Sequence, residues 1–420
     1  MDSASHPSEG TATGAYSVDE YLRRILESIG PLQPYDQPLL ETLGLPLCED
    51  ITSSIDLPRF TNSAVDGYAV HQYDIESASR DYPATLAVVG ESAAGTSKPY
   101  ALAPGTAIKI MTGAPMPTGA DTVVPIEATN GGTATVAIYE TPALGAHVRA
   151  AGEDITEGEL ILDEGAVIGA REAGLLASLG RSQIRARPRP RVVIISTGTE
   201  LREPGASLDF DSIYDGNSFM LAAAARALGA IAYRVGVVSD NVAAFSDVLS
   251  DQLVRADLVV TSGGVSKGNY DVVKEALAGL GTVDFCEVAM QPGKPQGFGL
   301  VGAESTPIIT LPGNPVSAYV SFEVFVVPAL RRMMGLLPYR RPLVQAMLGE
   351  DLASPAGKRQ YVRGMFEVTQ HGARVTPVGG SGSHMIGGLA KANALIVVGE
   401  DETALNVGDT ARVLVLDRSF

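Results

Sequence analysis

The sequence has few of the residues that form disulfides or bind zinc. It contains only two cysteines, Cys48 and Cys286, and five scattered histidines among 420 residues. Two cysteines cannot build a framework of disulfides and are typical of a reducing compartment, so we expect a cytoplasmic protein. Neither residue type occurs at the CxxC or HExxH spacing that marks a zinc site. These absences exclude a disulfide-stapled scaffold and the common zinc motifs.

Basic residues and long apolar runs are also scarce. The chain has 31 lysines and arginines against 48 acidic residues, which gives a net charge of −17 and a pI of about 4.7. An acidic surface is a poor match for nucleic acid or anionic membranes, so we expect neither as a partner. The most apolar stretch, residues 316–330, contains Glu323 and Pro328 and is shorter than the roughly 20 residues of a membrane helix. Residues 1–16 lack the apolar core of a signal peptide and are expected to form a disordered tail.

Apolar residues make up 45% of the sequence, and its length predicts about two to four domains. Ser17 and Glu20 have the spacing of a capping box, which predicts a helix over residues 17–30 that packs on an α/β domain. Short β-like runs separated by glycine and proline predict smaller β-rich domains elsewhere. The predicted boundaries are 31–58 with 146–187 for a linker and first β domain, 59–145 for a second β-rich domain, 188–335 for the α/β domain, and 336–420 for a C-terminal β-barrel-like domain.

Segment 188–335 alternates β-branched apolar runs with helical patterns, which predicts a doubly wound parallel sheet. Within it, Asn217 or Ser218 is expected to cap a helix that runs through Leu228. Ligands bind such sheets beyond the carboxyl ends of the strands. Polar motifs follow the predicted strands at 197–200, Asp240, 262–271 and 312–317. Their convergence predicts a binding site along one rim of the sheet.

The richest of these motifs is the loop from Ser262 to Asp271, which contains Gly263, Gly264 and Ser266. The two glycines permit a sharp turn and a close approach to a ligand, and the amides at the start of the next helix suit an anion. A carboxylate beside a phosphate is repulsive unless a metal or a proton lies between them. The loop therefore suggests a phosphoester site with a divalent cation. A glycine turn followed by an Asp cap is the alternative, and the convergence of motifs on the rim favours the functional interpretation.

Motifs along the whole chain resemble one family, the molybdopterin molybdenumtransferases, which are related to the gephyrin E domain. The resemblance runs in order from about residue 17 to residue 420. No single motif carries it, because the Ser-Gly-Gly-Val-Ser loop also occurs in molybdopterin adenylyltransferases. The matching motifs are 62–69, 110–114 and 152–154 in the first half, and 197–201, 262–271, 292–295 and 311–317 in the second.

The resemblance implies an enzyme that takes adenylylated molybdopterin and molybdate, releases AMP and forms molybdenum cofactor. It implies that Mg²⁺ is held by carboxylates of the rim, which suit this ion together with phosphate oxygens. The expected metal ligands are Asp271, Glu200 and Asp240. The expected catalytic residues are these three together with Asp66 and Thr112. The residues expected to bind molybdopterin or molybdate are Ser262, Gly263, Gly264, Ser266, Gly313, Asn314, Ser317, Lys294, Arg363 and Ser383.

Asp66, Thr112 and Asp154 match first-half positions of the family. In that family the first half of one subunit lies over the site of its partner, so the resemblance implies a homodimer with a composite site. A turn-forming aspartate at position 66 and an ordinary loop acid at position 154 are the structural alternatives.

One departure from the family concerns the expected oxyanion pocket. The family usually has Lys-Pro-Gly-Lys where this chain has Gln291-Pro292-Gly293-Lys294, so one cation is missing. Two other functions stay open, an adenylyltransferase and a gephyrin-like binding scaffold. The first-half and C-terminal domains argue against the former, because that activity needs only the α/β unit. No peptide groove is marked in the sequence.

Overall fold

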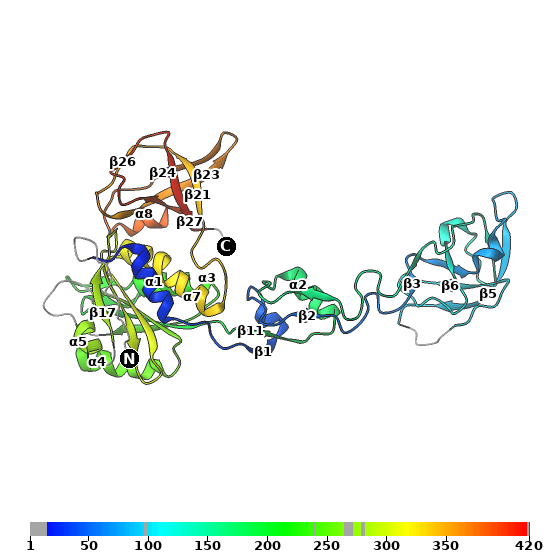
Figure 1. Ribbon diagram of the computed structural model, residues 1–420, viewed down its shortest axis with the longest axis horizontal. Coiled ribbons are helices and arrows are strands. Elements are labelled where there is room, and N and C mark those ends of the chain that lie inside the picture. Colours follow the sequence, from blue (N-terminus) through cyan, green and yellow to red (C-terminus); the bar gives the residue numbers. More distant parts are fainter. Residues whose placement is uncertain (1–14, 96–99, 239–240, 264–271, 279–281, 418–419) are drawn as a thin grey trace, which may run out of the picture. The chain divides into compact units, whose positions relative to one another are not determined.

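The computed structural model describes residues 15–95, 100–238, 241–263, 272–278, 282–417 and 420 (Figure 1). The chain forms two compact units. The first consists of residues up to 48, 167–170 and 183–420, and the second of residues 49–166 and 171–182. The predicted domains are a finer division than these units, and their boundaries stay predictions. Among the described residues, no helix has the length and apolar character needed to cross a membrane.

The first unit begins with helix α1 (Val18–Ser28), which confirms the predicted capping box. The hydroxyl of Ser17 accepts a hydrogen bond from the backbone N–H of Glu20 at 3.2 Å, and the Glu20 carboxylate accepts one from the N–H of Ser17 at 2.8 Å. The buried face of α1 includes Tyr21, whose ring meets that of Phe325 edge-on at 5.0 Å. This helix therefore packs on the core of the α/β domain, as the sequence predicts.

A six-stranded sheet with the order β15-β12-β16-β20-β19-β17 forms the centre of the first unit. Strands β15, β12, β16 and β20 are parallel, which confirms the predicted parallel sheet, whereas β19 runs antiparallel to β20. The bounds are β12 Arg191–Thr197, β15 Ile231–Val238, β16 Leu258–Ser262, β17 Asp284–Glu287, β19 Pro295–Val301 and β20 Thr306–Leu311.

Both faces of this sheet are buried. Successive side chains of its central strands point to opposite faces, and those on each face are apolar. Val192 and Ile194 belong to a core that includes residues of α3, and Val193 and Ile195 belong to a second core with residues of α4 and α5. Apolar burial on both faces is typical of parallel sheets covered by helices. The helices are α3 Asn217–Ala227, α4 Val242–Leu253 and α5 Val272–Ala278, and a continuous helical segment follows β20 as α6 Pro315–Ser321, π-helix η4 Phe322–Val326 and α7 Val327–Met334.

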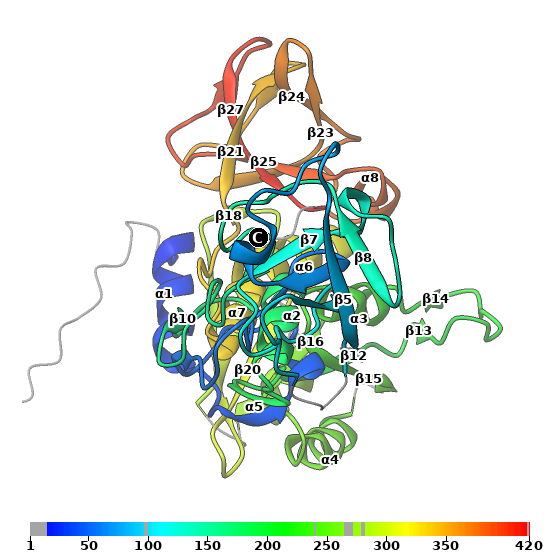
Figure 2. The same cartoon turned by 90° about the vertical axis from the view of Figure 1, so that its right-hand side faces the viewer.

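The C-terminal part of the first unit is a closed five-stranded barrel, which is seen in Figure 2. Its strands follow the order β23-β24-β21-β27-β25, and pairing of β25 with β23 closes the ring, while β18 extends the sheet at β23. Closure leaves no free edge among these five strands, and the predicted β-barrel-like domain is confirmed. The bounds are β18 Met290–Gln291, β21 Leu343–Leu348, β23 Arg359–Thr369, β24 Gly372–Pro377, α8 Ile386–Ala390, β25 Ala394–Val398 and β27 Thr410–Val415.

Short elements complete the first unit. They are β1 Tyr35–Pro38 paired with β11 Gln183–Ala186, the 3₁₀ helix η1 Leu39–Thr42, β13 Leu201–Arg202 paired with β14 Ile213–Tyr214, and β22 Leu352–Ala353 paired with β26 Ala404–Leu405.

The second unit is β-rich and is built around a five-stranded sheet with the order β7-β4-β6-β5-β8. Gly67 is required at the start of β4, because a Cβ atom there would lie 2.0 Å from the carbonyl oxygen of Val124 on β7. The bounds are β2 Ile51–Thr52, β3 Asn62–Ser63, β4 Gly67–Val70, η2 Gln72–Ile75, β5 Ala84–Ser92, β6 Thr106–Ile110, β7 Thr122–Pro125, η3 Ile126–Ala128, β8 Thr135–Ile138, β9 Val148–Arg149, β10 Leu160–Leu162 and α2 Ala170–Ser178.

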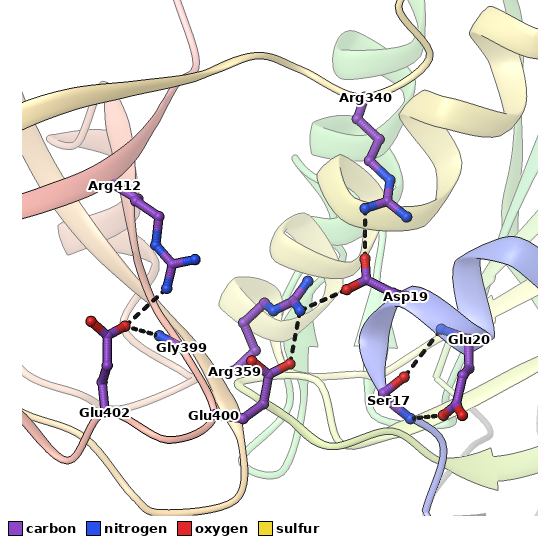
Figure 3. Close-up of polar contacts among 9 residues, drawn as sticks. All are labelled: Ser17, Asp19, Glu20, Arg340, Arg359, Gly399, Glu400, Glu402 and Arg412. Atoms are coloured by element: carbon purple, nitrogen blue, oxygen red, sulfur yellow. Dashed lines mark hydrogen bonds and ion pairs between the residues drawn. The ribbon is translucent and has the colours of Figure 1, made fainter. Parts of the chain in front are cut away.

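An ion-pair network joins α1 to the C-terminal barrel within the first unit (Figure 3). The carboxylate of Asp19 accepts hydrogen bonds from Arg340 at 2.6 Å and from Arg359 at 2.7 Å, and Arg359 also pairs with Glu400 at 2.8 Å. The hydrogen bond from Arg359 lowers the pKa of the Asp19 carboxyl, against the opposing effect of partial burial. The charged form of Asp19 therefore stabilises the folded protein.

We expect Asp19→Asn to lower the free energy of unfolding at neutral pH by about 1 kcal/mol, since a half-exposed pair is weakened by solvent. A carboxyl whose folded pKa is lowered contributes stability above its unfolded pKa, near 3.9, and loses it as the pH falls through the folded value. The difference between variant and wild type should thus shrink below about pH 4. Urea unfolding across the acid range measures this difference, with Asp251→Asn as a control at an exposed position of α4. A difference that persists undiminished in acid would contradict this role.

Candidate functional site

Three neighbouring parallel strands end together at one rim of the central sheet. The register pairs Ser196 with Ser262, and Ser262 with Leu311, so the loops after β12, β16 and β20 emerge side by side. Gly263 has a φ of +98°, and a Cβ atom there would lie 3.1 Å from the carbonyl oxygen of Thr197. Its N–H donates to the carbonyl of Leu311 at 3.1 Å. Glycine therefore allows the backbones of these loops to approach closely, as the sequence predicts for a ligand site.

Glu200 lies on the same rim. The backbone before it turns at Gly198, where a Cβ atom would lie 2.7 Å from a carboxylate oxygen of Glu200. The side chain of Glu200 therefore folds back over the end of β12 and stays exposed to solvent. It is the one expected metal ligand within the described residues, because Asp240 and Asp271 lie outside them. Two residues expected to bind molybdopterin or molybdate, Gly264 and Ser266, also lie outside the described residues. No cluster of three or more potential metal ligands occurs in the part of the chain that is described.

The loop with Lys294 reaches this rim from the antiparallel strand β19. Gly297 pairs with Thr310 near the carboxyl end of β20, so the residues before Gly297 lie beyond that end. Buried Gln296 supports the loop by donating to the carbonyl of Gly293 at 2.6 Å. The ammonium of Lys294 forms an ion pair with Glu287 at 2.8 Å. The lysine of this loop thus has a carboxylate partner in the protein itself.

The loop with Ser383 lies against the start of α6. The backbone N–H of Val316 donates to the carbonyl of Ser383 at 3.0 Å, which places Ser383 beside the segment that carries Asn314 and Ser317. Asn314 is the N-cap residue of α6 and is exposed, whereas Ser317 is buried in its first turn. The structure therefore brings together three of the predicted residues from positions about 70 residues apart in the sequence.

Arg363 organises that second loop from strand β23. Its guanidinium is 4% exposed and donates to the carbonyl of Met385 at 2.6 Å and to the carbonyl of Gly380. Burial lowers the pKa of this guanidinium. We expected Arg363 to bind the ligand directly; in the structure its donors hold the loop on which Ser383 lies. A direct role stays a prediction.

Asp66 and Thr112 meet in the second unit, although they are 46 positions apart in the sequence. One carboxylate oxygen of Asp66 accepts from the backbone N–H of Thr112 at 2.7 Å and from its hydroxyl at 2.8 Å. These two hydrogen bonds lower the pKa of the Asp66 carboxyl, which is fully exposed. The second carboxylate oxygen accepts no hydrogen bond within the described residues, so the charged group remains accessible to a ligand. Asp154 is an exposed loop residue of the same unit.

Sequence reasoning missed the role of Asn217. Gly216 occupies the N-cap position of α3 without a side-chain cap, and Asn217 is the first helical residue. The expectation that Asn217 or Ser218 caps this helix was therefore wrong. The amide of Asn217 instead donates to the hydroxyl of Ser262 at 2.8 Å and to the carbonyl of Gly313 at 2.6 Å. No local pattern shows this, because the partners lie 45 and 96 positions away.

Comparisons with known proteins identify relatives along nearly the whole chain. Family descriptions match residues 16–180 (MoeA N-terminal region, domain I and II), 193–332 (probable molybdopterin binding domain) and 345–416 (MoeA C-terminal region, domain IV). Molybdopterin molybdenumtransferase 2 of Mycobacterium tuberculosis H37Rv is 44% identical over 403 residues, which cover 94% of this chain and 98% of that protein. The molybdopterin molybdenumtransferase of Haemophilus influenzae is 34% identical over 401 residues, which cover 94% and 98% of the two chains.

A solved structure has a similar fold. The molybdopterin biosynthesis moeA protein from Pyrococcus horikosii is 29% identical and has a TM-score of 0.80. The similarity covers 96% of this chain and 100% of that one.

Proposed function

The chain belongs to the molybdopterin molybdenumtransferase family and is an enzyme that inserts molybdenum into molybdopterin, and we propose that its substrates are adenylylated molybdopterin and molybdate, with AMP released. The convergence of three glycine-containing loops at the rim carries this proposal. The alignment with named transferases along 94% of the chain favours it over an adenylyltransferase or a binding scaffold. Release of AMP from adenylylated molybdopterin on addition of molybdate tests it.

We propose that the rim loops hold the pyrophosphate of the substrate. Backbone amides of the Gly263 and Gly313 loops are suited to phosphate oxygens, because glycine lets the backbone approach them. Glu200 presents an exposed carboxylate beside this cradle, which is the chemistry that Mg²⁺ requires together with phosphate oxygens. Asp240 and Asp271 are proposed as its other ligands. Bound there, Mg²⁺ would neutralise the charge that develops as AMP leaves.

We propose that molybdate binds between the Lys294 loop and the Ser383 loop. Lys294, Ser317 and Ser383 offer one cation and two hydroxyls, and such donors suit an oxyanion. The ion pair of Lys294 with Glu287 and the neutral side chain of Gln291 leave this pocket with little net positive charge. We therefore expect this chain to bind molybdate less tightly than a relative with the usual Lys-Pro-Gly-Lys sequence.

We expect Gln291→Lys to lower the half-saturating concentration of molybdate by about tenfold. Two charges at about 4 Å attract by on the order of 4 kcal/mol at an effective dielectric of 20, and desolvation and salt reduce the net gain to about 1 kcal/mol. Glu287→Gln should act in the same direction, since it releases Lys294. Titration of molybdate against AMP release measures both, with Gln370→Lys as a matched control in the β23–β24 turn. An unchanged half-saturating concentration in Gln291→Lys would show that position 291 does not touch the oxyanion, or that Arg363 or Lys358 already supplies the charge.

We propose a homodimer in which Asp66 and Thr112 act at the partner's rim. A chain with Asp66→Ala and a chain with Asp271→Ala should each be inactive alone and should regain up to about half of the activity when co-assembled, because one intact composite site forms. Co-assembly of Asp271→Ala with Glu200→Ala is the control, since both changes damage the rim. No recovery in verified heterodimers would mean that Asp66 serves its own subunit or is structural.

A further inference from the structure

Asn217 bridges the loops that follow two adjacent strands of the rim. Its Nδ2 atom donates to the hydroxyl of Ser262 at the end of β16 and to the carbonyl of Gly313 after β20. A carbonyl can only accept, so the atom that faces Gly313 must be the amide nitrogen. Both N–H groups of this amide are therefore used on the loops. The remaining oxygen has no partner among the described residues.

Buried Asp215, which is 1% exposed, fixes the backbone on either side of Asn217. Asp215 accepts from the N–H and hydroxyl of Ser218 at 3.0 and 2.5 Å, and from the hydroxyl of Ser196 on β12 at 3.1 Å. The start of α3 is thus fixed to the end of β12. Asn217 extends from this fixed point and ties the ends of β16 and β20 to it.

These hydrogen bonds determine which groups the loops present to a ligand. Because the Ser262 oxygen accepts from Asn217, its own hydrogen is directed elsewhere as a donor. The C=O and N–H of one planar trans peptide point in opposite directions, so holding the Gly313 carbonyl sets the direction of the Asn314 N–H. Asn217 thereby restricts the directions of two donors on neighbouring loops, and donors of this kind suit an anion.

We propose that Asn217 is a positioning residue that orients the Ser262 hydroxyl and the Asn314 amide toward the pyrophosphate of the substrate. The inference rests on the proposed function for the identity of the ligand. It assigns Asn217 no contact with the reacting atoms. Its effect is to keep the Gly263 and Gly313 loops at one spacing. The two loops are neighbours, since a Cβ atom built on Gly313 would lie 3.7 Å from the Cα atom of Gly263, in ordinary van der Waals contact.

The test compares Asn217→Ala with Asn217→Asp. Removal of both donors in Asn217→Ala should raise the KM for adenylylated molybdopterin about tenfold, which corresponds to about 1.4 kcal/mol. The isosteric Asn217→Asp should be worse, because a carboxylate repels the Gly313 carbonyl and the phosphates. A merely structural role predicts that both variants lose free energy of unfolding while the affinity of the folded protein for pyrophosphate stays unchanged. Asn130→Ala is the matched control, because Asn130 also bridges two backbone groups, but in the second unit.

A double-mutant cycle with Ser262→Ala adds a second criterion. If Asn217 acts through Ser262, Asn217→Ala should cost less in the Ser262→Ala background than in the wild type. Binding of inorganic pyrophosphate by each variant, measured by calorimetry, keeps the test independent of turnover. Wild-type pyrophosphate binding in Asn217→Ala and Asn217→Asp would overturn the proposal, as would strict additivity in the cycle. A wild-type enzyme that releases no AMP, while these variants still lose pyrophosphate binding, would refute the proposed function and leave the role of Asn217 standing.

Discussion

An Asp271→Asn enzyme is expected to bind adenylylated molybdopterin but to release AMP about tenfold to a hundredfold more slowly. Asp271 closes the glycine-rich loop that begins at Ser262, and Glu200 contributes a carboxylate to the same rim. Replacement by the amide keeps the size of the side chain but removes the charge of a residue that we propose as a ligand of Mg²⁺. Changes around metal ligands typically cost this much in affinity or activity.

Single-turnover AMP release and a separate titration of substrate binding measure the two effects. Asp251→Asn makes the same substitution at an exposed position of α4 and should behave like the wild type. Raising the Mg²⁺ concentration should restore part of the rate in Asp271→Asn. Wild-type rates of AMP release at both limiting and saturating Mg²⁺ would remove Asp271 from the mechanism.

Gly67→Ala is expected to destabilise the second unit by about 3 kcal/mol, the upper end of the cost of overpacking. The added methyl would meet the carbonyl oxygen of Val124 at 2.0 Å, and backbone of a neighbouring strand cannot move aside as a flexible side chain can. Relief of this clash must separate β4 from β7, and Gly67 directly follows Asp66. The variant should therefore also lose the contact of Asp66 with Thr112, and activity should fall with it.

Gly174→Ala provides the matched control in the same unit. Gly174 lies within α2, and nothing lies within 4 Å of a Cβ atom built there. Alanine is favoured over glycine inside a helix by up to about 1 kcal/mol, so this variant should be slightly more stable than the wild type. Chemical denaturation monitored in the second unit compares the two. Equal stability of both variants would contradict the close packing of β4 on β7.

Local signals were sufficient to predict the parts of the fold that depend on neighbouring residues. The Ser17 and Glu20 capping box and the apolar runs of β12, β16 and β20 act within a few positions of sequence. The antiparallel strand β19 was not predicted, because Pro295 and two glycines at 297 and 299 give it little β propensity. Gly297 is needed there, since a Cβ atom would lie 2.1 Å from the hydroxyl of Thr310. Tertiary packing therefore requires glycine at position 297, although glycine has a low propensity for β-strands.

The parts of the candidate site that follow from sheet topology could be predicted from the sequence. The parts that depend on individual long-range contacts could not. Parallel strands bring their carboxyl ends to one edge, so Glu200, Ser262 and Gly313 could be grouped from sequence. The donors of Arg363 are used on loop carbonyls, and the amide of Asn217 reaches loops far away in sequence. Neither orientation has a local signature, because each depends on how the barrel and the helix α3 are placed on the sheet.

We propose that this chain transfers molybdenum from molybdate to molybdopterin with release of AMP. The most direct measurement is incubation of the purified enzyme with adenylylated molybdopterin, molybdate and Mg²⁺, followed by quantification of AMP and of the metal-loaded cofactor. We predict that AMP and loaded cofactor form in equal amounts and that both require molybdate. Formation of AMP without loaded cofactor, or no AMP at all from an enzyme that binds the adenylylated pterin, would contradict the account.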